Sequence, residues 1–307
     1  MTETFPFASR ELSQSLELAE AIGSSRFVEA RARVFPDSGA TWIEVAGARA
    51  MYDGATSPLT QTFGLGLFQP ATAADLDAIE AFYAERCAPV FHEVSPLADA
   101  GLPALLAGRG YRPCEFTSVM YRPIDLGGLK APFDPAGLKA CTTSEAGTAG
   151  LKACTTSEAC TTEAEVVQAF RPAITVRLVE KGEEEIYART AAAGWSEFGV
   201  SDFVLEIGRV SGQVEGLRLF LAELDGRPIG AGALGLNGTV AHLAGASTIP
   251  DGRNRGAQRA LLAHRLRDAA AHGCGLALMG ALPGSGSQRN AERNGFRIAY
   301  TRIKWQR

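Results

Sequence analysis

Three apolar segments separated by turn dipeptides dominate the second half of the chain. They are LRLFLAEL (217–224), RPIGAGALGL (227–236) and TVAHLAGAS (239–247), with Asp-Gly at 225–226 and Asn-Gly at 237–238 between them. These dipeptides between apolar runs are the strongest short hairpin signals, because their residues accept the left-handed backbone of tight turns. The pattern predicts an antiparallel meander of three strands.

A helical pattern follows the meander. Apolar residues recur on one face from about Arg255 to His272, and Gly273 stands where a helix ends in a left-handed residue. LALMG (276–280) then predicts a buried strand, Ser287 caps a short helix ending at Gly295, and FRIAYTRIKW (296–305) predicts an alternating strand. The predicted order is β-β-β-α-β-α-β.

The first half repeats nearly the same order. Strands are expected at TWIEVAG (41–47), ARAMYDG (48–54), LTQTFGLGLF (59–68), VFHEV (90–94) and YRPCEFTSVMYRPI (111–124), with helices at 74–87 and 97–110. The two halves also end alike, with Arg-Gly-Tyr-Arg at 109–112 and Asn-Gly-Phe-Arg at 294–297. We infer two copies of one α/β architecture.

A segment of different composition separates the copies. The decapeptide GLKACTTSEA occurs at 137–146 and again at 150–159. Its small and polar residues bury little surface, which favours a linker or surface excursion without a role of its own over a docking element. The expected domains are 1–125, a linker over 126–165, and 166–307, in keeping with a length of 307 residues.

Composition narrows the class of protein. The chain is 46% apolar and 21% charged, and its apolar runs stay well short of the roughly 18 residues that span a membrane. The first residues do not form an export signal, so the cytoplasm is the expected location. The six cysteines form no C-x-x-C pair, and no metal site is expected. A net charge of −4 argues against a nucleic-acid partner and leaves any anion site to local geometry.

Local geometry of that kind is predicted at residues 250–258, PDGRNRGAQ. The first turn of a helix leaves about four backbone N–H groups unpaired and carries roughly half a positive charge. Gly256 removes a side chain from the turn, and Arg253, Arg255 and Arg259 add positive charge. Arginine here opposes the helix dipole unless an anion binds, so the segment predicts a pyrophosphate site.

Two common nucleotide motifs are excluded. The chain lacks G-x-x-x-x-G-K-[ST], so hydrolysis of a nucleoside triphosphate is not indicated. Gly230, Gly232 and Gly235 match the dinucleotide pattern G-x-G-x-x-G, but an Asn-Gly turn and another strand follow them instead of a helix. We reject an NAD site.

PDGRNRGAQ after a strand and at the start of a helix resembles the acetyl-CoA signature R/Q-x-x-G-x-G/A of the GNAT N-acyltransferase superfamily. Arg253 and Gly256 match, and Gln258 stands where the family usually has glycine or alanine. Ser287 to Asn290, closing at Gly295-Phe296, resembles the family's second segment. The resemblance covers roughly 215–305 and implies a tandem α/β protein whose domains are each a mixed, mostly antiparallel twisted sheet flanked by helices.

The resemblance also implies which residues hold acetyl-CoA. The end of the third meander strand and the following loop would bind the acyl carbonyl and the diphosphate, and Asn290 would approach the pantetheine arm. The implied acetyl-CoA residues are Ser247, Thr248, Ile249, Arg253, Asn254, Arg255, Gly256, Ala257, Gln258, Arg259 and Asn290.

The first copy lacks this chemistry. Pro70 stands where Pro250 stands, but the next helix begins with Asp75 and Asp77 and has neither arginine nor glycine. Carboxylates at this place satisfy the helix's own N–H groups and repel a diphosphate. We therefore expect one CoA site, in the second half, with a degenerate first copy serving as scaffold or substrate wall.

The family mechanism implies direct attack of an amine on the thioester, with backbone N–H groups of the third meander strand stabilising the oxyanion. Many members protonate the leaving sulfur with a tyrosine, at a position that is Ala291 here. Tyr300 is the nearest alternative acid, although a tyrosine in an amphipathic strand is more often structural. Glu223 and His242 are candidate bases, and a water-relayed proton transfer would need neither.

The acceptor is the least determined element. Trp195, Phe198 and Phe203 lie where the family builds its acceptor wall, and they could equally be core. The leading hypothesis is an acetyl-CoA-dependent N-acetyltransferase acting on a small-molecule or peptide amine, without a membrane partner. The alternatives are a non-catalytic acyl-CoA-binding or regulatory protein, and a structural protein whose basic turn meets an acidic partner.

Overall fold

A computed structural model describes residues 5–125 and 174–307. The predicted linker at 126–165, with both copies of GLKACTTSEA, lies outside the described residues. The domain limits therefore stay predictions.

The first half forms the strands and helices that its sequence predicts, behind a long N-terminal helix that was not predicted. Its elements are α1 (Arg10–Val34), β1 (Thr41–Val45), β2 (Ala48–Tyr52), β3 (Gln61–Phe63), α2 (Ala73–Ala84), β4 (Phe91–Val94), α3 (Leu102–Gly108) and β5 (Arg112–Pro123). Ser9 caps α1 by accepting a hydrogen bond from the Leu12 amide, and apolar residues such as Leu16 and Val28 are fully buried along it.

The second half contains the predicted meander and the helices that follow it. Its elements are β6 (Ile174–Leu178), α4 (Glu184–Ala193), α5 (Ser201–Ser211), β7 (Leu217–Leu224), β8 (Arg227–Asn237), β9 (Val240–Thr248), α6 (Ala257–Ala271), β10 (Leu276–Ala281), α7 (Gly286–Arg293) and β11 (Arg297–Gln306). The cap of α7 is Ser285, whose hydroxyl accepts from the Gln288 amide, so the prediction of Ser287 as the cap was wrong by two residues.

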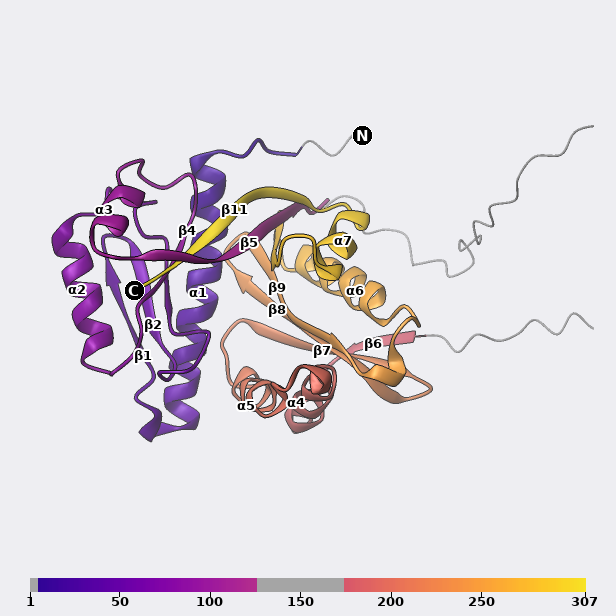
Figure 1. The fold of residues 1–307 in the computed structure, drawn as a ribbon. Coiled ribbons are helices and arrows are strands. Elements are labelled where there is room, and N and C mark those ends of the chain that lie inside the picture. The colour runs from indigo at the N-terminus through magenta and orange to yellow at the C-terminus, as the bar shows by residue number, and fades with distance from the viewer. Residues whose placement is uncertain (1–4, 126–173) are drawn as a thin grey trace, which may run out of the picture.

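The eleven strands formed by residues 5–125 and 174–307 join in one sheet, in the order β1-β2-β3-β4-β11-β5-β10-β9-β8-β7-β6. Among these described strands only β3–β4 and β9–β10 pair in parallel, so the expectation of mixed, mostly antiparallel sheets is confirmed. The last strands of the two halves have exchanged places. β11 pairs with β4 of the first half, and β5 pairs with β10 of the second, while β5 and β11 pair with each other at the centre of the sheet (Figure 1).

Helices cover both faces of this sheet. α1, α4 and α5 lie on one face, where Tyr187 and Ala191 of α4 pack on Leu221 and Ala233. α6 lies on the other face, where its Leu261 packs with Phe220 and Leu234. Among the described residues, no helix is both long and apolar enough to cross a membrane.

Candidate active site

The candidate site begins where β9 and β10 part. Their parallel pairing runs from Val240 opposite Leu276 only as far as His242 opposite Leu278. Beyond that point β9 continues beside β8 to Thr248, and β10 continues beside β5 to Ala281. The end of β9 therefore has a strand partner on one side only, which leaves its other edge available to a ligand.

A β-bulge in β9 lies three residues beyond the parting point. Ala231 faces Ser247 while Ala233 faces Ala244, so β9 holds one residue more than β8 across this interval. Gly245 adopts a φ of +58°, which favours glycine, and both Gly245 and Ala246 are exposed. The bulge breaks the ladder and presents backbone groups of β9 at the opening.

Arg265 of α6 lies behind the bulge. Its Nη1 donates to the carbonyl oxygens of Ala233 at 2.9 Å and Ala244 at 3.2 Å, and the residue is 4% exposed. No carboxylate of the described residues forms an ion pair with it. Burial lowers the pKa of Arg265 to about 10, so the guanidinium stays charged at neutral pH. The bulge is backed by a buried positive charge.

The loop from β9 to α6 presents the predicted anion site. A 3-10 turn at Pro250–Gly252 packs Gly252 closely against Ile229, and Asn254 and Gly256 take left-handed φ values of +61° and +90°. Gly256 is the N-cap of α6, and no side chain caps the helix. The loop's exposed residues include Arg253, Asn254, Arg255, Gly256 and Arg259, and Pro250 and Asp251 before them are exposed as well. Uncapped amides and three arginines therefore share one surface.

The equivalent helix of the first half is closed. The Thr72 hydroxyl accepts from the Asp75 amide at 3.3 Å, and Asp75 Oδ2 accepts from the Thr72 amide at 2.8 Å, which is a complete capping box. Asp77 pairs with Arg109 at 2.7 Å. The backbone N–H groups at the start of α2 are therefore capped by side chains of the same segment, in contrast to those at the start of α6.

The other predicted CoA residues contribute backbone or support. The Ser247 hydroxyl donates to the Ala191 carbonyl at 3.0 Å and ties β9 to α4. Gln258, the departure from the family signature, donates to the Thr248 hydroxyl at 2.8 Å and pins the start of α6 to the end of β9. Ile249 and Ala257 are buried in the core.

Asn290 and Ala291 lie in α7, the helix after β10. The Asn290 carbonyl accepts from Asn294 Nδ2 at 2.7 Å, and the Asn290 side chain is partly exposed. Ala291 is fully buried in the same core as Leu261. Position 291 therefore faces the core, and no acid stands there.

The two predicted catalytic side chains are both engaged elsewhere. The Tyr300 hydroxyl donates to Glu17 Oε1 at 2.8 Å and is buried against α1, which raises its pKa above the ordinary value. Glu223 forms an ion pair with Arg177 Nε at 2.9 Å, and Arg177 also pairs with Glu183. Neither side chain is presented to the opening beside β9 without a partner.

A cavity of about 310 Å³ lies on the opposite face of the sheet from α6, between α1, α4, α5 and strands β8 and β9. We call it the acceptor pocket. Trp195 lines it, as the sequence suggested, and Phe198 contacts the Trp195 ring with centroids 5.5 Å apart. Phe198 is 65% exposed, and neither it nor Phe203 lines the pocket. Of the three aromatics, one therefore belongs to the cavity wall.

His242 and Tyr187 are two polar side chains of the acceptor pocket that the sequence did not place there. His242 lines it at the parting of β9 and β10, and burial lowers the pKa of His242, which keeps the imidazole neutral at pH 7. The Tyr187 hydroxyl lies 3.6 Å from the place of a Cβ on Gly245, and it makes no hydrogen bond within the described part of the chain. Tyr187 lies in a helix that no strong sequence signal singled out.

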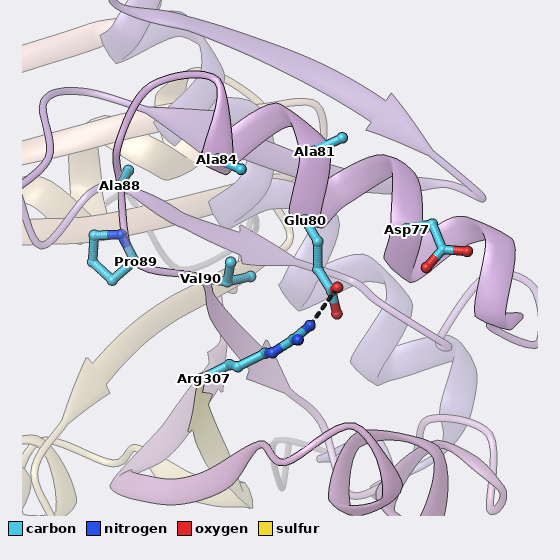
Figure 2. Close-up of a pocket in the computed structure, with 8 residues that line it drawn as sticks. All are labelled: Asp77, Glu80, Ala81, Ala84, Ala88, Pro89, Val90 and Arg307. Carbon is cyan, nitrogen blue, oxygen red and sulfur yellow. Dashed lines mark hydrogen bonds and ion pairs between the residues drawn. The ribbon is translucent and has the colours of Figure 1, made fainter.

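A second hollow, of about 480 Å³, lies beside α2 of the first half (Figure 2). Figure 2 shows Glu80 and Arg307 joined across it, while Asp77 lies further along α2. Glu80 also accepts a hydrogen bond from Tyr111 at 3.0 Å. The polar groups of this hollow already satisfy one another, and we assign no site to it.

Comparison with known proteins agrees with this arrangement. Residues 184–296 match the model of the acetyltransferase (GNAT) family. No curated protein sequence matches significantly. A GCN5-related N-acetyltransferase from Kribbella flavida is similar over 92% of this chain and 95% of its own, with a TM-score of 0.57 and 19% identity.

Two further solved structures share the fold. A GCN5-related N-acetyltransferase from Sphaerobacter thermophilus is similar over 80% of this chain and 71% of its own, with a TM-score of 0.50 and 17% identity. A tandem GNAT protein from the clavulanic acid biosynthesis pathway is similar over 85% of this chain and 78% of its own, with a TM-score of 0.54 and 14% identity. Residues 184–296 are thus similar to the GNAT acetyltransferase family, and the chain as a whole shares its fold with a tandem GNAT protein.

Proposed function

We propose that the protein is an acetyl-CoA-dependent N-acyltransferase with one active site, in its second half, and a primary amine as acceptor. The observation that carries the proposal is the contrast between two equivalent helices. α2 caps its own amides with Thr72 and Asp75, whereas α6 leaves its amides uncapped beside Arg253, Arg255 and Arg259. An uncapped basic helix start is costly unless an anion binds there.

In this proposal the diphosphate of acetyl-CoA binds at the start of α6, and the pantetheine arm follows the unpaired edge of β9 toward the bulge. The Asn290 side chain borders the arm from α7. The thioester then lies at Gly245 and Ala246, where the face of the sheet opposite α6 carries the acceptor pocket. Donor and acceptor would meet through the opening between β9 and β10.

The chemistry is a single acyl transfer. The amine nitrogen attacks the thioester carbonyl, a C–N bond forms, the C–S bond breaks, and CoA leaves as a thiol. Backbone N–H groups of the bulge and the buried charge of Arg265 stabilise the oxyanion, because a fixed charge in a dry site needs no reorganisation during the reaction. We assign no metal to the reaction.

Proton transfer is assigned to the pocket side chains in place of Tyr300 and Glu223. Neutral His242 accepts the proton of the attacking amine, directly or through one water. The Tyr187 hydroxyl, whose pKa burial raises to about 12, gives its proton to the leaving sulfur and is reprotonated from the His242 imidazolium, so both side chains return to their starting states. Tyr300 and Glu223 act instead through the ion-pair networks that hold α1 and β6 on the sheet.

Calorimetric titration with acetyl-CoA tests the proposal. The variant Arg255→Glu/Arg259→Glu should bind acetyl-CoA at least tenfold more weakly, because it reverses two charges beside the diphosphate. Arg267→Glu is the matched control, since Arg267 is an exposed arginine of the same helix that lies two turns beyond Arg259. Equal affinity in all three proteins would contradict the assignment.

The buried Ala291 favours a second candidate, an acyl-CoA-binding protein without transferase activity. Both candidates predict that acetyl-CoA binds. Release of free thiol on addition of amines separates them, since only a transferase releases CoA in proportion to the amine consumed.

A further inference from the structure

We propose that Asn237 is a positioning residue of the proton-transfer step, and that its side-chain amide fixes a water on the imidazole of His242. This inference rests on the proposed function, in which His242 accepts the proton of the attacking amine. It concerns one part of the acceptor pocket, which we call the polar niche. Gly23 of α1, Gly235 of β8, Asn237 and His242 border the niche, and all four line the pocket.

The backbone requires glycine at neither glycine of the polar niche. Gly23 lies inside α1 and Gly235 inside β8, and neither has the positive φ that favours glycine. Glycine inside a helix or strand is unfavourable compared with alanine, because it loses more conformational freedom on folding. The reason for the two glycines therefore lies in the space that a Cβ would take.

A Cβ at either glycine would stand against the same amide. From Gly23 it would lie 3.4 Å from Asn237 Nδ2 and 3.9 Å from His242 Nδ1. From Gly235 it would lie 3.3 Å from Asn237 Nδ2 and 3.7 Å from His242 Cβ. A helix of the first half and a strand of the second thus both leave room beside the Asn237 amide, next to the imidazole.

The Asn237 side chain is buried, with 6% of its surface exposed, and only one side of its amide is paired. Arg26 Nη1 donates to Asn237 Oδ1 at 3.3 Å and to the Leu236 carbonyl at 3.2 Å, which holds the carbonyl side of the amide toward Arg26. Asn237 Nδ2 has no hydrogen-bond partner in the described part of the chain. A buried donor is unfavourable unless an acceptor meets it, so Nδ2 favours a small acceptor beside it.

His242 supplies the second partner of that water. Its imidazole is neutral at pH 7, so one ring nitrogen carries a proton and the other accepts a hydrogen bond. Nδ1 is the ring nitrogen that borders Gly23. One water accepts from Asn237 Nδ2 and donates to His242 Nδ1, which fixes the tautomer of His242 with its proton on Nε2.

This water gives the proton a defined path. Once the amine nitrogen has bonded to the acyl carbon, its N–H bond breaks and the proton passes to the water oxygen. The water passes one of its own protons to His242 Nδ1, where a new N–H bond forms, and the water is regenerated. Because Asn237 Nδ2 occupies one lone pair of the water oxygen, the other lone pair is left for the amine. Asn237 thus orients the water without touching the amine.

Nitrogen-15 NMR of the imidazole rings tests the water site without acetyl-CoA or an acceptor. The full chain, labelled at its histidine rings, is measured at neutral pH, and the signals of His242 are identified by their loss in His242→Gln. We expect a protonated Nε2 and an unprotonated Nδ1 that accepts a hydrogen bond. A protonated Nδ1 would overturn the inference, because that nitrogen then has no lone pair to accept with.

Two variants remove the water in different ways. Gly23→Ala places a methyl group in the polar niche at ordinary contact distance, and Asn237→Leu removes the donor. In both, the Nδ1 resonance of His242 should move downfield, toward that of a ring nitrogen without a hydrogen bond. Gly108→Ala is the control for adding a methyl to a helix, since Gly108 is the exposed last residue of α3 and a Cβ there would meet nothing within 4 Å. An unchanged Nδ1 resonance in Gly23→Ala would exclude the water site.

Release of free thiol from acetyl-CoA then tests the positioning role. With an amine that the wild type acetylates, both Gly23→Ala and Asn237→Leu should lower kcat about tenfold or more. The KM of the amine should change by less than about twofold, because the water serves proton transfer and not binding. A wild-type kcat in either variant, beside a shifted Nδ1 resonance, would show that the water plays no part in the reaction.

These measurements separate failure of this inference from failure of the proposed function. If amines are acetylated while His242 Nδ1 is protonated, the positioning role of Asn237 is wrong and the transferase proposal stands. If Nδ1 accepts a hydrogen bond but the wild type acetylates no amine, the water site stands, and both the transferase proposal and the positioning role fail.

Discussion

Arg253, in the loop before α6, forms an ion pair with Glu197, in the connection between α4 and α5. The pair joins the proposed diphosphate site to the segment that carries Trp195 at the acceptor pocket. In the proposed site, Glu197 therefore pairs with a guanidinium that would otherwise be free to face the diphosphate. Because both side chains are partly exposed, with 39% and 54% of their surfaces accessible, the pair contributes at most ~1 kcal/mol.

Glu197→Gln should therefore bind acetyl-CoA about two- to fivefold more tightly than the wild type, since the diphosphate no longer competes with a carboxylate. Calorimetric titration at low salt measures the change, and raising the salt should reduce it. Asp202→Asn is the control, because Asp202 is an exposed carboxylate at the start of α5. A weaker affinity in Glu197→Gln would show that Glu197 helps CoA to bind.

His242 as the proton acceptor predicts the acid limb of the pH–rate profile. Burial lowers the pKa of His242 below the ordinary histidine value of about 6.5. The imidazole therefore stays neutral at pH values that would protonate an exposed histidine. The acid limb of kcat/KM should therefore fall below pH 6.5. His242→Gln should lower kcat by about 100-fold and remove that limb, with acetyl-CoA affinity unchanged. A variant that keeps both the rate and the limb would exclude His242 from the chemistry.

The junction of the two halves holds a buried charge cluster that predicts pH-dependent stability. Arg302 is surrounded by Glu17, Glu20 and Glu93, and burial raises the pKa of Glu17 to about 7. The folded state thus binds a proton that the unfolded state has lost above about pH 4.3. This contribution lowers the free energy of unfolding as the pH rises from about 4.3 to 7.

Glu17→Gln should remove this loss. Relative to the wild type, its free energy of unfolding should increase by ~2–3 kcal/mol between pH 5 and pH 8, as measured by urea unfolding. Glu20→Gln provides the contrast, because Arg302 lowers the pKa of Glu20 against the effect of burial and its charge supports the fold. That variant should be less stable than the wild type at pH 7. A constant difference between Glu17→Gln and the wild type would show that Glu17 is ionised throughout.

Strand exchange predicts that neither half folds well alone. Without β5, a fragment of residues 166–307 leaves both β10 and β11 without their shared neighbour at the centre of the sheet. Unpaired strand edges promote aggregation. The fragment should be recovered from the insoluble fraction when expressed alone and should co-purify with residues 1–125 when the two are expressed together. A soluble, monomeric fragment with acetyl-CoA affinity like that of the full chain would contradict this account.

The local elements, and the helix start at Gly256 on which the anion site was predicted, could be read from the sequence because their signals are local. Turn dipeptides at 225–226 and 237–238 determine where the strands of the meander end. The arginines around Gly256 lie at the N-terminus of α6, as the sequence predicted. The difference between the two helix starts was also predictable, since Asp75 completes a capping box with Thr72.

Long-range pairing was not predictable. β5 and β11 have the same alternation of apolar and polar residues. That alternation does not specify whether a strand pairs with strands of the first half or of the second. For the same reason Tyr300 was named as a candidate acid, although its hydroxyl donates a hydrogen bond to Glu17, which lies 283 residues away in the sequence. Tyr187 was missed because it lies beside the bulge at Gly245, and the position of a bulge depends on the register of β8 and β9.

The central claim is that the exposed amides at the start of α6 hold the diphosphate of CoA. A crystal structure of the full chain with CoA tests it most directly. The account predicts the diphosphate within hydrogen-bonding distance of the backbone N–H groups of residues 255–259, with the pantetheine arm beside β9. A diphosphate bound at α2 of the first half, or anywhere else away from α6, would contradict it.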